Sequence, residues 1–149
     1  MENIINVKFR IKSIEKEEYS TTIDGIDLSA MDESNLAFQY RISTEFNLTE
    51  DEIVVRPEIR YKYNQTQVFV GGADVVFYVQ DLSSIVKIDS DKMQLDISVD
   101  ILPTLLSAAY STLRGLVHTQ LIGTPLASFP IPLLEVNNLL TKNGLSVRN

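Results

Sequence analysis

The feature that most constrains the fold is a long alternation of residue types at positions 36–48. One parity carries mainly large apolar side chains and the other mainly polar ones; the apolar parity is Leu36, Phe38, Tyr40, Ile42, Thr44, Phe46 and Leu48. Side chains two residues apart leave a β-strand on the same face. Residues 36–48 are therefore predicted to form a strand with one buried and one solvated face.

Three further segments have strand character, at residues 5–12, 53–63 and 68–80. Asn64-Gln65 predicts a hairpin turn between the last two of them. Pro57 removes a ladder donor, which suggests an edge position or a bulge for the strand at 53–63. The polar stretch at 15–35 is interpreted as a loop with space for a short helical turn.

The segment at 68–80 is apolar on both parities, unlike the others. Such a strand is normally covered on both faces. Because the sequence offers a single layer of helix, the second face is expected to meet another subunit or a ligand. Gly71-Gly72 suggests a bulge or bend in this strand, and residues 85–88 are a candidate extension of the sheet.

Helical spacing begins after residue 100. Apolar residues recur in steps of three and four over 102–121, which predicts an amphipathic helix. Asp100 is the candidate N-cap, Pro103 fits the first turn, and Gly123 marks the end. A second, short helix is predicted at 133–142. Strands followed by helices give a single α+β domain over 1–149, with a four-stranded antiparallel sheet.

An apolar segment with three prolines follows the long helix. Pro125, Pro130 and Pro132 alternate with Leu, Ile and Phe residues. Prolines are expected to hold this segment extended and to prevent regular strand pairing. Two interpretations remain: the segment closes the core of its own domain, or it forms the floor of a groove for another chain.

Composition and motifs argue against several functions. A net charge of −7 with a pI near 4.6 disfavours nucleic-acid binding. The chain has no cysteine and one histidine, His118, and it lacks a nucleophile elbow, a glycine-rich phosphate loop and an EF-hand pattern. We therefore predict no catalytic, cofactor-binding or metal-binding residues, and a protein that is not an enzyme. The sequence shows no transmembrane run and no signal-peptide core, so a cytoplasmic location without membrane insertion is expected.

The face of the helix opposite its leucines is polar and rich in small side chains. Gly115 in mid-helix costs about 1 kcal/mol relative to alanine. This face is either solvated or packed against a symmetry-related helix in an oligomer. The candidate oligomer-interface residues are Ser111, Arg114, Gly115 and His118.

Residues 98–140 resemble the C-terminal half of the SecB family, the bacterial protein-export chaperones. In that family a long helix with a central arginine ends in a glycine-led turn, and an apolar, proline-containing loop leads to a short final helix. Here Arg114 corresponds to the arginine, Gly123-Thr124 to the turn, and Phe129-Pro130-Ile131-Pro132 to the loop. The succession of four strands before the helix also matches.

The resemblance implies an ATP-independent chaperone, assembled as a tetramer from two dimers, with apolar grooves that hold unfolded polypeptide clients. It also implies docking to a SecA-like translocase motor. The candidate client-binding residues are Phe69, Val75, Phe77, Tyr78, Phe129 and Ile131, each with membership of the chain's own core as the alternative.

The sequence departs from the family pattern in several places. Pro132-Leu133-Leu134-Glu135 replaces the family's Pro-Val-Asn-Phe, and Thr112-Leu113-Arg114 replaces its Tyr-Ala-Arg. The family is expected to bind the motor partly through acidic residues on its sheet, whereas the strand at 53–63 is net basic. The alternative function is therefore a SecB-like adaptor or structural domain that recognises one specific partner, for example in guarding an antitoxin.

Overall fold

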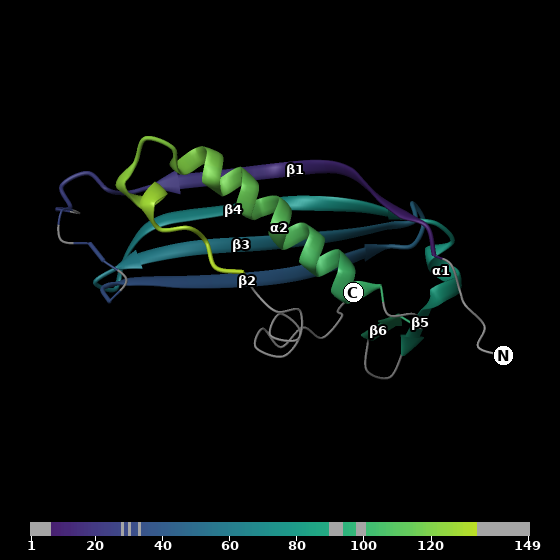
Figure 1. Ribbon diagram of the computed structural model, residues 1–149. Coiled ribbons are helices and arrows are strands. Elements are labelled where there is room, and N and C mark those ends of the chain that lie inside the picture. The colour runs from purple at the N-terminus through teal and green to yellow at the C-terminus, as the bar shows by residue number, and fades with distance from the viewer. Residues whose placement is uncertain are drawn as a thin grey trace.

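A four-stranded antiparallel sheet forms the centre of the molecule. The computed structural model describes residues 7–27, 29, 31–32, 34–89, 94–97 and 101–133. The sheet consists of β1 (Phe9–Thr21), β2 (Leu36–Asn47), β3 (Glu52–Tyr63) and β4 (Thr66–Val79). Their spatial order is β1-β4-β3-β2, so β1 and β2 are the edge strands and the chain crosses over between them (Figure 1).

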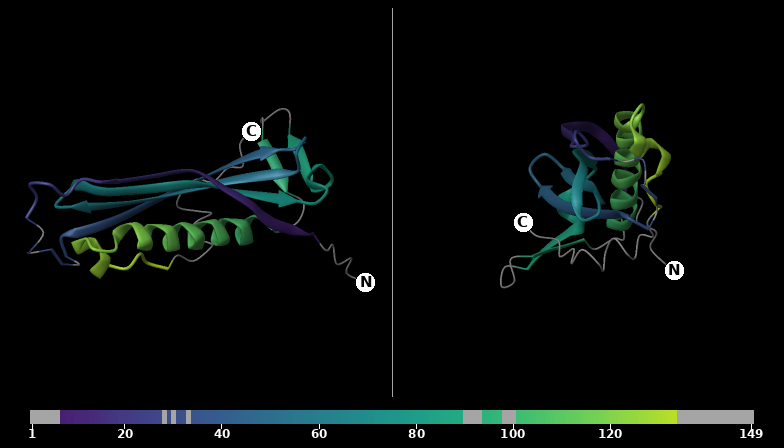
Figure 2. Two further views of the ribbon diagram at one scale, coloured as in Figure 1. Left: turned by 90° about the horizontal axis from the view of Figure 1, so that it is seen from above. Right: turned by 90° about the vertical axis from the view of Figure 1, so that its left-hand side faces the viewer.

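The long helix α2 (Leu102–Leu121) forms a second layer on one face of the sheet. It crosses the strands obliquely (Figure 1), and the left-hand view of Figure 2 shows the sheet and the helix as two layers. The smaller elements are α1 (Leu82–Ile85), β5 (Val86–Asp89), β6 (Gln94–Ile97) and the 3₁₀ turn η1 (Pro125–Ser128). The predicted α+β class and antiparallel sheet are confirmed.

The hydrophobic core lies between α2 and the sheet face that α2 covers, called the helix-side face below. The helix contributes its predicted stripe of Leu105, Leu106, Ala109, Leu113, Val117 and Leu121. The sheet contributes alternate residues of β3 and β4, among them Ile53, Val55, Ile59, Phe69, Val75 and Phe77. Each large apolar side chain buried in this way contributes about 1.5–3 kcal/mol.

The first strand departs most from the sequence-based prediction. Residues up to Thr21 belong to β1, so the interpretation of the whole 15–35 stretch as a loop is wrong. The pairing with β4 is irregular between Ile11 and Ser13 and again between Glu15 and Glu18, where Lys16 has a φ of 50°. Each bulge shifts the inward parity, which hides the period of two.

The third strand is central, so the edge position or bulge inferred from Pro57 is wrong. Pro57 lies opposite Ile42, and the β2–β3 register runs without a shift through this pair. One missing donor is tolerated here inside a long ladder. The predicted hairpin turn is confirmed, because Asn64 and Gln65 both have positive φ, at 47° and 69°. That combination is typical of the tight turns that match strand twist.

Gly71 and Gly72 do not form a bulge in β4; they allow close approach on both sides of the strand. A Cβ on Gly71 would lie 3.0 Å from the ring of Phe69 and 3.0 Å from Val117 of α2. A Cβ on Gly72 would lie 3.2 Å from a guanidinium nitrogen of Arg56 on the opposite face. The glycine pair therefore sets how closely the helix and an arginine side chain approach the sheet.

Residues 85–88 do not extend the main sheet. Val86–Asp89 pairs with Gln94–Ile97 in a separate two-stranded sheet. The chain leaves β4 through Asp81, which has a φ of 54°, and the turn α1. The turn at Asp81 and α1 therefore directs β5 away from the edge of the main sheet.

The two ends of α2 largely follow the sequence signals. Pro103 lies in the first turn, and Gly123 follows the helix with a φ of 85°. Pro125 lies in the 3₁₀ turn η1, so it does not hold the chain extended as predicted. Asp100, the predicted N-cap, lies outside the described residues. The helix predicted at 133–142 also lies outside them, apart from Leu133.

Candidate functional site

An aromatic cluster lies on the helix-side face near the β2 edge. Tyr40 meets Tyr110 of α2 edge to face, with ring centroids 6.3 Å apart, and Phe38 meets Tyr61 in the same way at 5.7 Å. Phe69 lies beside Tyr61, at 6.4 Å. These five rings, Phe38, Tyr40, Tyr61, Phe69 and Tyr110, are called the aromatic cluster. They join β2, β3, β4 and α2 in one apolar cluster.

The segment at 124–133, called the strap, lies along α2 and over the sheet next to this cluster (Figure 1). The hydroxyl of Tyr61 donates a hydrogen bond of 2.6 Å to the carbonyl of Phe129. The hydroxyl of Tyr110 donates one of 2.8 Å to the carbonyl of Pro132. Arg114 donates through Nε to the carbonyl of Ile131 at 3.3 Å. Three side chains of the folded body therefore hold main-chain carbonyls of the strap.

The apolar side chains of the strap divide between the core and the surface. Leu126 is fully buried and Ile131 is 7% exposed. Phe129 is half-buried, while Pro130 and Pro132 are exposed and Leu133 is 80% exposed. The strap thus contributes to the core at two positions and presents apolar surface at others.

Burial of the two tyrosines changes their acidity. Removal from water raises the pKa of Tyr61 to about 12 and raises the pKa of Tyr110 further, because the phenolate form loses hydration. Both hydroxyls are protonated at neutral pH, as tyrosine normally is, and burial extends the pH range in which they donate to the strap.

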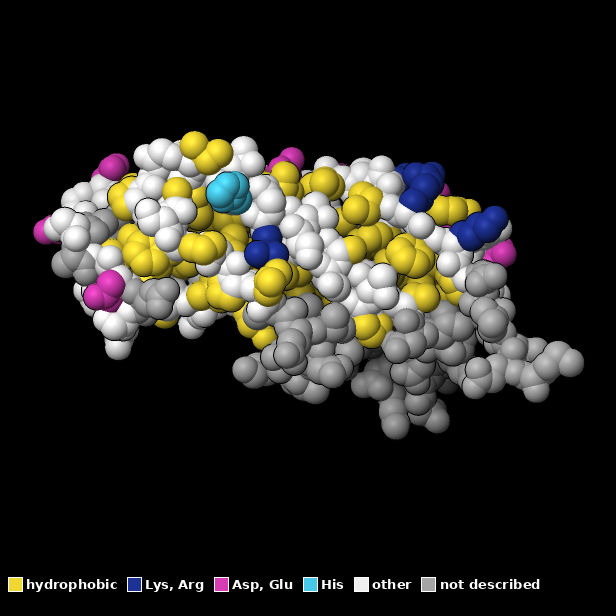
Figure 3. Space-filling view, in the orientation of Figure 1, with side chains coloured by type: hydrophobic (Ala, Val, Ile, Leu, Met, Phe, Trp, Pro, Cys, Tyr) yellow, Lys and Arg dark blue, Asp and Glu magenta, His cyan; other side chains and the backbone are white. Residues whose placement is uncertain are grey.

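A strip of apolar side chains is exposed on the edge strand β1. Phe9, Ile11 and Ile14 are 39%, 44% and 38% exposed. They lie opposite Val79, Phe77 and Val75 of β4, so they point to the helix-side face. Figure 3 shows hydrophobic side chains spread over this side of the molecule, with few charges among them. These three residues are called the β1 strip.

The outward face of α2 is open. Ser111, Gly115 and His118 are exposed, and a Cβ on Gly115 would meet nothing within 4 Å. Arg114 is half-buried and uses Nε to bind the strap. The contacts described within one chain therefore do not require a glycine at 115, and they give Arg114 a carbonyl partner.

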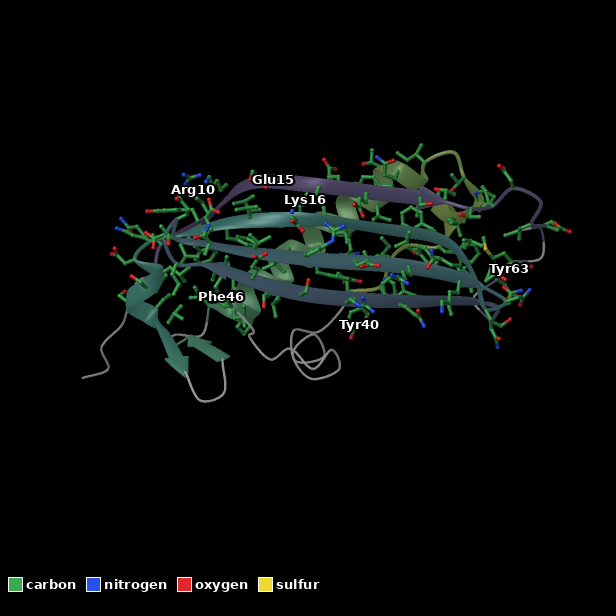
Figure 4. All side chains as sticks on the ribbon, turned by 180° about the vertical axis from the view of Figure 1, so that it is seen from behind. Arg10, Glu15, Lys16, Tyr40, Phe46 and Tyr63 are labelled. Carbon is green, nitrogen blue, oxygen red and sulfur yellow. The ribbon has the colours of Figure 1, made fainter. Side chains whose placement is uncertain are left out.

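None of the described helices covers the opposite face of the sheet, called the back face (Figure 4), and charged side chains form a network there. Arg56 of β3 reaches across β4: its guanidinium lies 3.1 Å from Asp74 and 3.2 Å from Glu18. It also donates to the carbonyl of Lys16, within the β1 bulge, at 3.1 Å. One arginine thus ties the irregular edge strand to the sheet.

The second apolar side of β4 is covered in part by charged side chains of its neighbours. Val76 is 4% exposed, and the guanidinium of Arg10 lies 5.3 Å from the ring centre of Tyr78. Long basic side chains can cover apolar surface with their stems while their charges stay in water. The expectation that a second subunit or a ligand covers this face therefore has a competing explanation within the chain.

The Arg56 network borders a shallow depression on the back face, with a volume of about 640 Å³. Its lining carries charges of both signs: Lys16 and Arg56 with Glu18, Glu45 and Asp74. Arg60 pairs with Glu58 at 2.5 Å nearby. The central back face is therefore electrically mixed rather than uniformly acidic or basic.

The structure distributes the candidate client-binding residues over three environments. Phe69, Val75 and Phe77 are fully buried under α2, and Ile131 is nearly so, which places these four in the core of the chain. Phe129 is half-buried in the strap. Tyr78 is half-buried on the back face, away from the others. The residues proposed for one groove therefore do not form one continuous accessible surface.

Several residues of these surfaces were missed by sequence reasoning. Tyr61 and Tyr110 carry no local signal for binding a segment far along the chain. Phe9 and Ile11 belong to the strand predicted at 5–12, whereas Ile14 lies outside it, and the bulge that places Ile14 on the same face cannot be seen from a period of two. Residues 5–14 contain an ordinary share of apolar side chains, so the sequence carries no signal that these side chains are exposed.

The described residues contain no group of three or more metal-ligating side chains. Within them no helix is both long and apolar enough to cross a bilayer. Neither a protein-family model nor a curated protein matches the sequence.

Proposed function

We propose that the protein is a SecB-like, ATP-independent chaperone that binds extended apolar segments of unfolded polypeptides. The observation that carries this proposal is the β1 strip, in which Phe9, Ile11 and Ile14 expose more than a third of their surface at a sheet edge. Clustered exposed apolar side chains mark interaction surfaces in soluble proteins. An edge strand adds unpaired main-chain groups beside them.

Both edges of the sheet support binding of an extended chain. Among the described residues no strand pairs with the outer side of β1 or of β2. β2 pairs with β3 over its whole length without a register shift, so its outer side presents a regular ladder. Binding by main-chain pairing and by apolar contact tolerates many client sequences, and it requires neither a cofactor nor a nucleotide.

The proposal includes assembly of several copies through the open face of α2. Gly115 supports it, because glycine costs helix stability and gains nothing from contacts described within the chain. Small residues around Ser111 would allow a second helix to approach closely. Light scattering at micromolar concentration tests this: Gly115→Leu is expected to reduce the mass, and Gln120→Leu, at an exposed position on another side of the helix, is the control. A wild-type monomer would rule out the assembly.

An aggregation assay tests the chaperone activity. The purified protein is added to a chemically unfolded client, and scattering is followed. We expect several-fold molar excess to suppress aggregation, and Ile11→Glu to weaken suppression by about tenfold in effective concentration. Ile122→Glu is the matched control, because Ile122 is more exposed, at 66%, and lies at the end of α2. Aggregation that proceeds unchanged with the wild-type protein would refute the proposal.

The mixed charge of the back face favours a second candidate function. Arg56 and Arg60 are paired with carboxylates, so this face lacks the broad acidic surface that the family resemblance associates with a SecA-like motor. The alternative is an adaptor on the same scaffold that recognises one specific partner, such as an antitoxin. Suppression of aggregation for several unrelated clients favours the chaperone, and binding restricted to one folded partner favours the adaptor.

A further inference from the structure

The strap is held in an unusual way for a core-closing segment. Its carbonyls at Phe129, Ile131 and Pro132 accept hydrogen bonds from Tyr61, Arg114 and Tyr110. These donors bind main-chain oxygens, which every residue type carries, proline included. The interaction therefore places no requirement on the side-chain polarity of the bound segment.

The side chains of the strap follow the pattern of an extended peptide in a groove. Phe129 is half-buried, Pro130 exposed, Ile131 buried and Pro132 exposed. Alternate residues thus point toward α2 and the sheet. The two prolines lack N–H groups, so at these positions the strap cannot donate to a strand edge.

We infer that the strap is an internal ligand: it occupies a site that binds extended apolar polypeptide, and a client enters by displacing residues 129–133. This inference rests on the proposed function and adds a second client site to the β1 strip. The incoming segment takes over the donors of Tyr61, Tyr110 and Arg114 through its own carbonyls, and it places an apolar side chain where Ile131 lies. Leu126, which is fully buried, anchors the other end of the strap.

With a displaceable strap, the apparent affinity is the intrinsic affinity multiplied by the fraction of molecules in which the strap is detached. Loosening the strap without altering the site must therefore tighten binding. Pro130→Gly/Pro132→Gly is the suitable variant, because both prolines are exposed and their carbonyls remain. Glycine raises the entropy of the detached strap. The matched control is Pro125→Gly, which changes an exposed proline in η1, before the latched carbonyls.

The probe is a fluorescently labelled synthetic peptide with the sequence of residues 124–133, measured by anisotropy. We expect the double variant to bind it about three- to tenfold more tightly than the wild type, and Pro125→Gly to behave as wild type. A peptide in which serine replaces the residue corresponding to Ile131 is expected to lose this binding. Equal affinity for the wild type and the double variant, or no binding to the double variant, would overturn the inference.

A second variant guards against misfolding of the first. Ile131→Ser removes the one nearly buried side chain of the segment 129–133, and it is expected to increase peptide binding in the same way. Ile122→Ser is its control. Suppression of client aggregation is measured on the same samples: its absence in every protein refutes the proposed function, whereas suppression with unchanged peptide affinity refutes the internal ligand alone.

Discussion

Phe77 and Tyr78 are neighbours on β4, yet their side chains meet two different environments. Phe77 is 1% exposed in the core under α2, whereas Tyr78 is half-buried on the back face beneath Arg10. Apolar burial stabilises the helix-side face, whereas on the back face Arg56 bridges three strands. One strand can therefore be apolar on both sides while a helix layer covers only one of them.

The largest predicted effect is a difference in unfolding free energy between alanine variants of Phe77 and Tyr78. Phe77→Ala is expected to cost about 3–5 kcal/mol of unfolding free energy, since it leaves a cavity in the core. Tyr78→Ala should cost about 1 kcal/mol, because it loses a partly solvated contact with Arg10. Urea unfolding followed by circular dichroism measures both. Similar losses at the two positions would show that the back face is as tightly packed as the core.

The adjacent glycines provide a second, smaller contrast. Gly71→Ala should cost about 1–3 kcal/mol, because the new methyl group meets Phe69 and Val117 at 3.0 Å inside the core. Gly72→Ala should cost less, since its nearest neighbour, at 3.2 Å, is the flexible end of Arg56. Thermal unfolding of both variants tests the order. A greater loss for Gly72→Ala would mean that the arginine cannot move aside.

Replacing the central arginine tests what holds the back face. Arg56→Met keeps most of the apolar stem and removes the guanidinium, and it should cost about 1–2 kcal/mol after allowance for solvent at the partly exposed network. The loss should be smaller in a background that already carries Asp74→Asn, since these two residues pair at 3.1 Å. Strict additivity in this double-mutant cycle would contradict the proposed pairing.

The helix-side face has a pH dependence of its own. Burial raises the pKa of Tyr61 to about 12 in the folded protein, while an unfolded tyrosine ionises near 10. The unfolded state therefore releases its proton first, and this contribution to stability falls as the pH rises from about 10 to about 12. Tyr61→Phe should remove that part of the dependence. Urea unfolding across this range tests the prediction, and a wild-type protein with constant stability there would contradict it.

Much of the fold was predictable because its signals are local. The strand at 36–48, the hairpin at Asn64-Gln65 and the helix ending before Gly123 depend on residues close together in the chain. The predicted loop at 15–35 failed for a local reason too, since the bulges around Lys16 disguise the strand pattern. The edge position or bulge predicted from Pro57 was wrong because a missing N–H donor does not show whether strands lie on both sides.

The functional surfaces were less accessible to sequence reasoning. A pattern of apolar residues cannot distinguish Phe69 and Phe77, which are buried, from Phe9 and Ile11, which are exposed. That distinction depends on where α2 crosses the sheet and on how far it reaches. The strap was recognised as an unusual segment, but its partners Tyr61 and Tyr110 lie far away in the chain.

The sequence alone determined the periodicities, the turn residues and the acidic, cysteine-free composition, because each belongs to a residue and its near neighbours. The strand order, the position of the strap against Tyr61 and Tyr110, and the contacts of Arg56 with β1 and β4 became visible only in the tertiary structure. Those depend on pairing between distant segments, where the free energy of a contact arises only once the chain has brought both partners together. The three carbonyls of the strap meet their hydrogen-bond donors only when these distant segments come together.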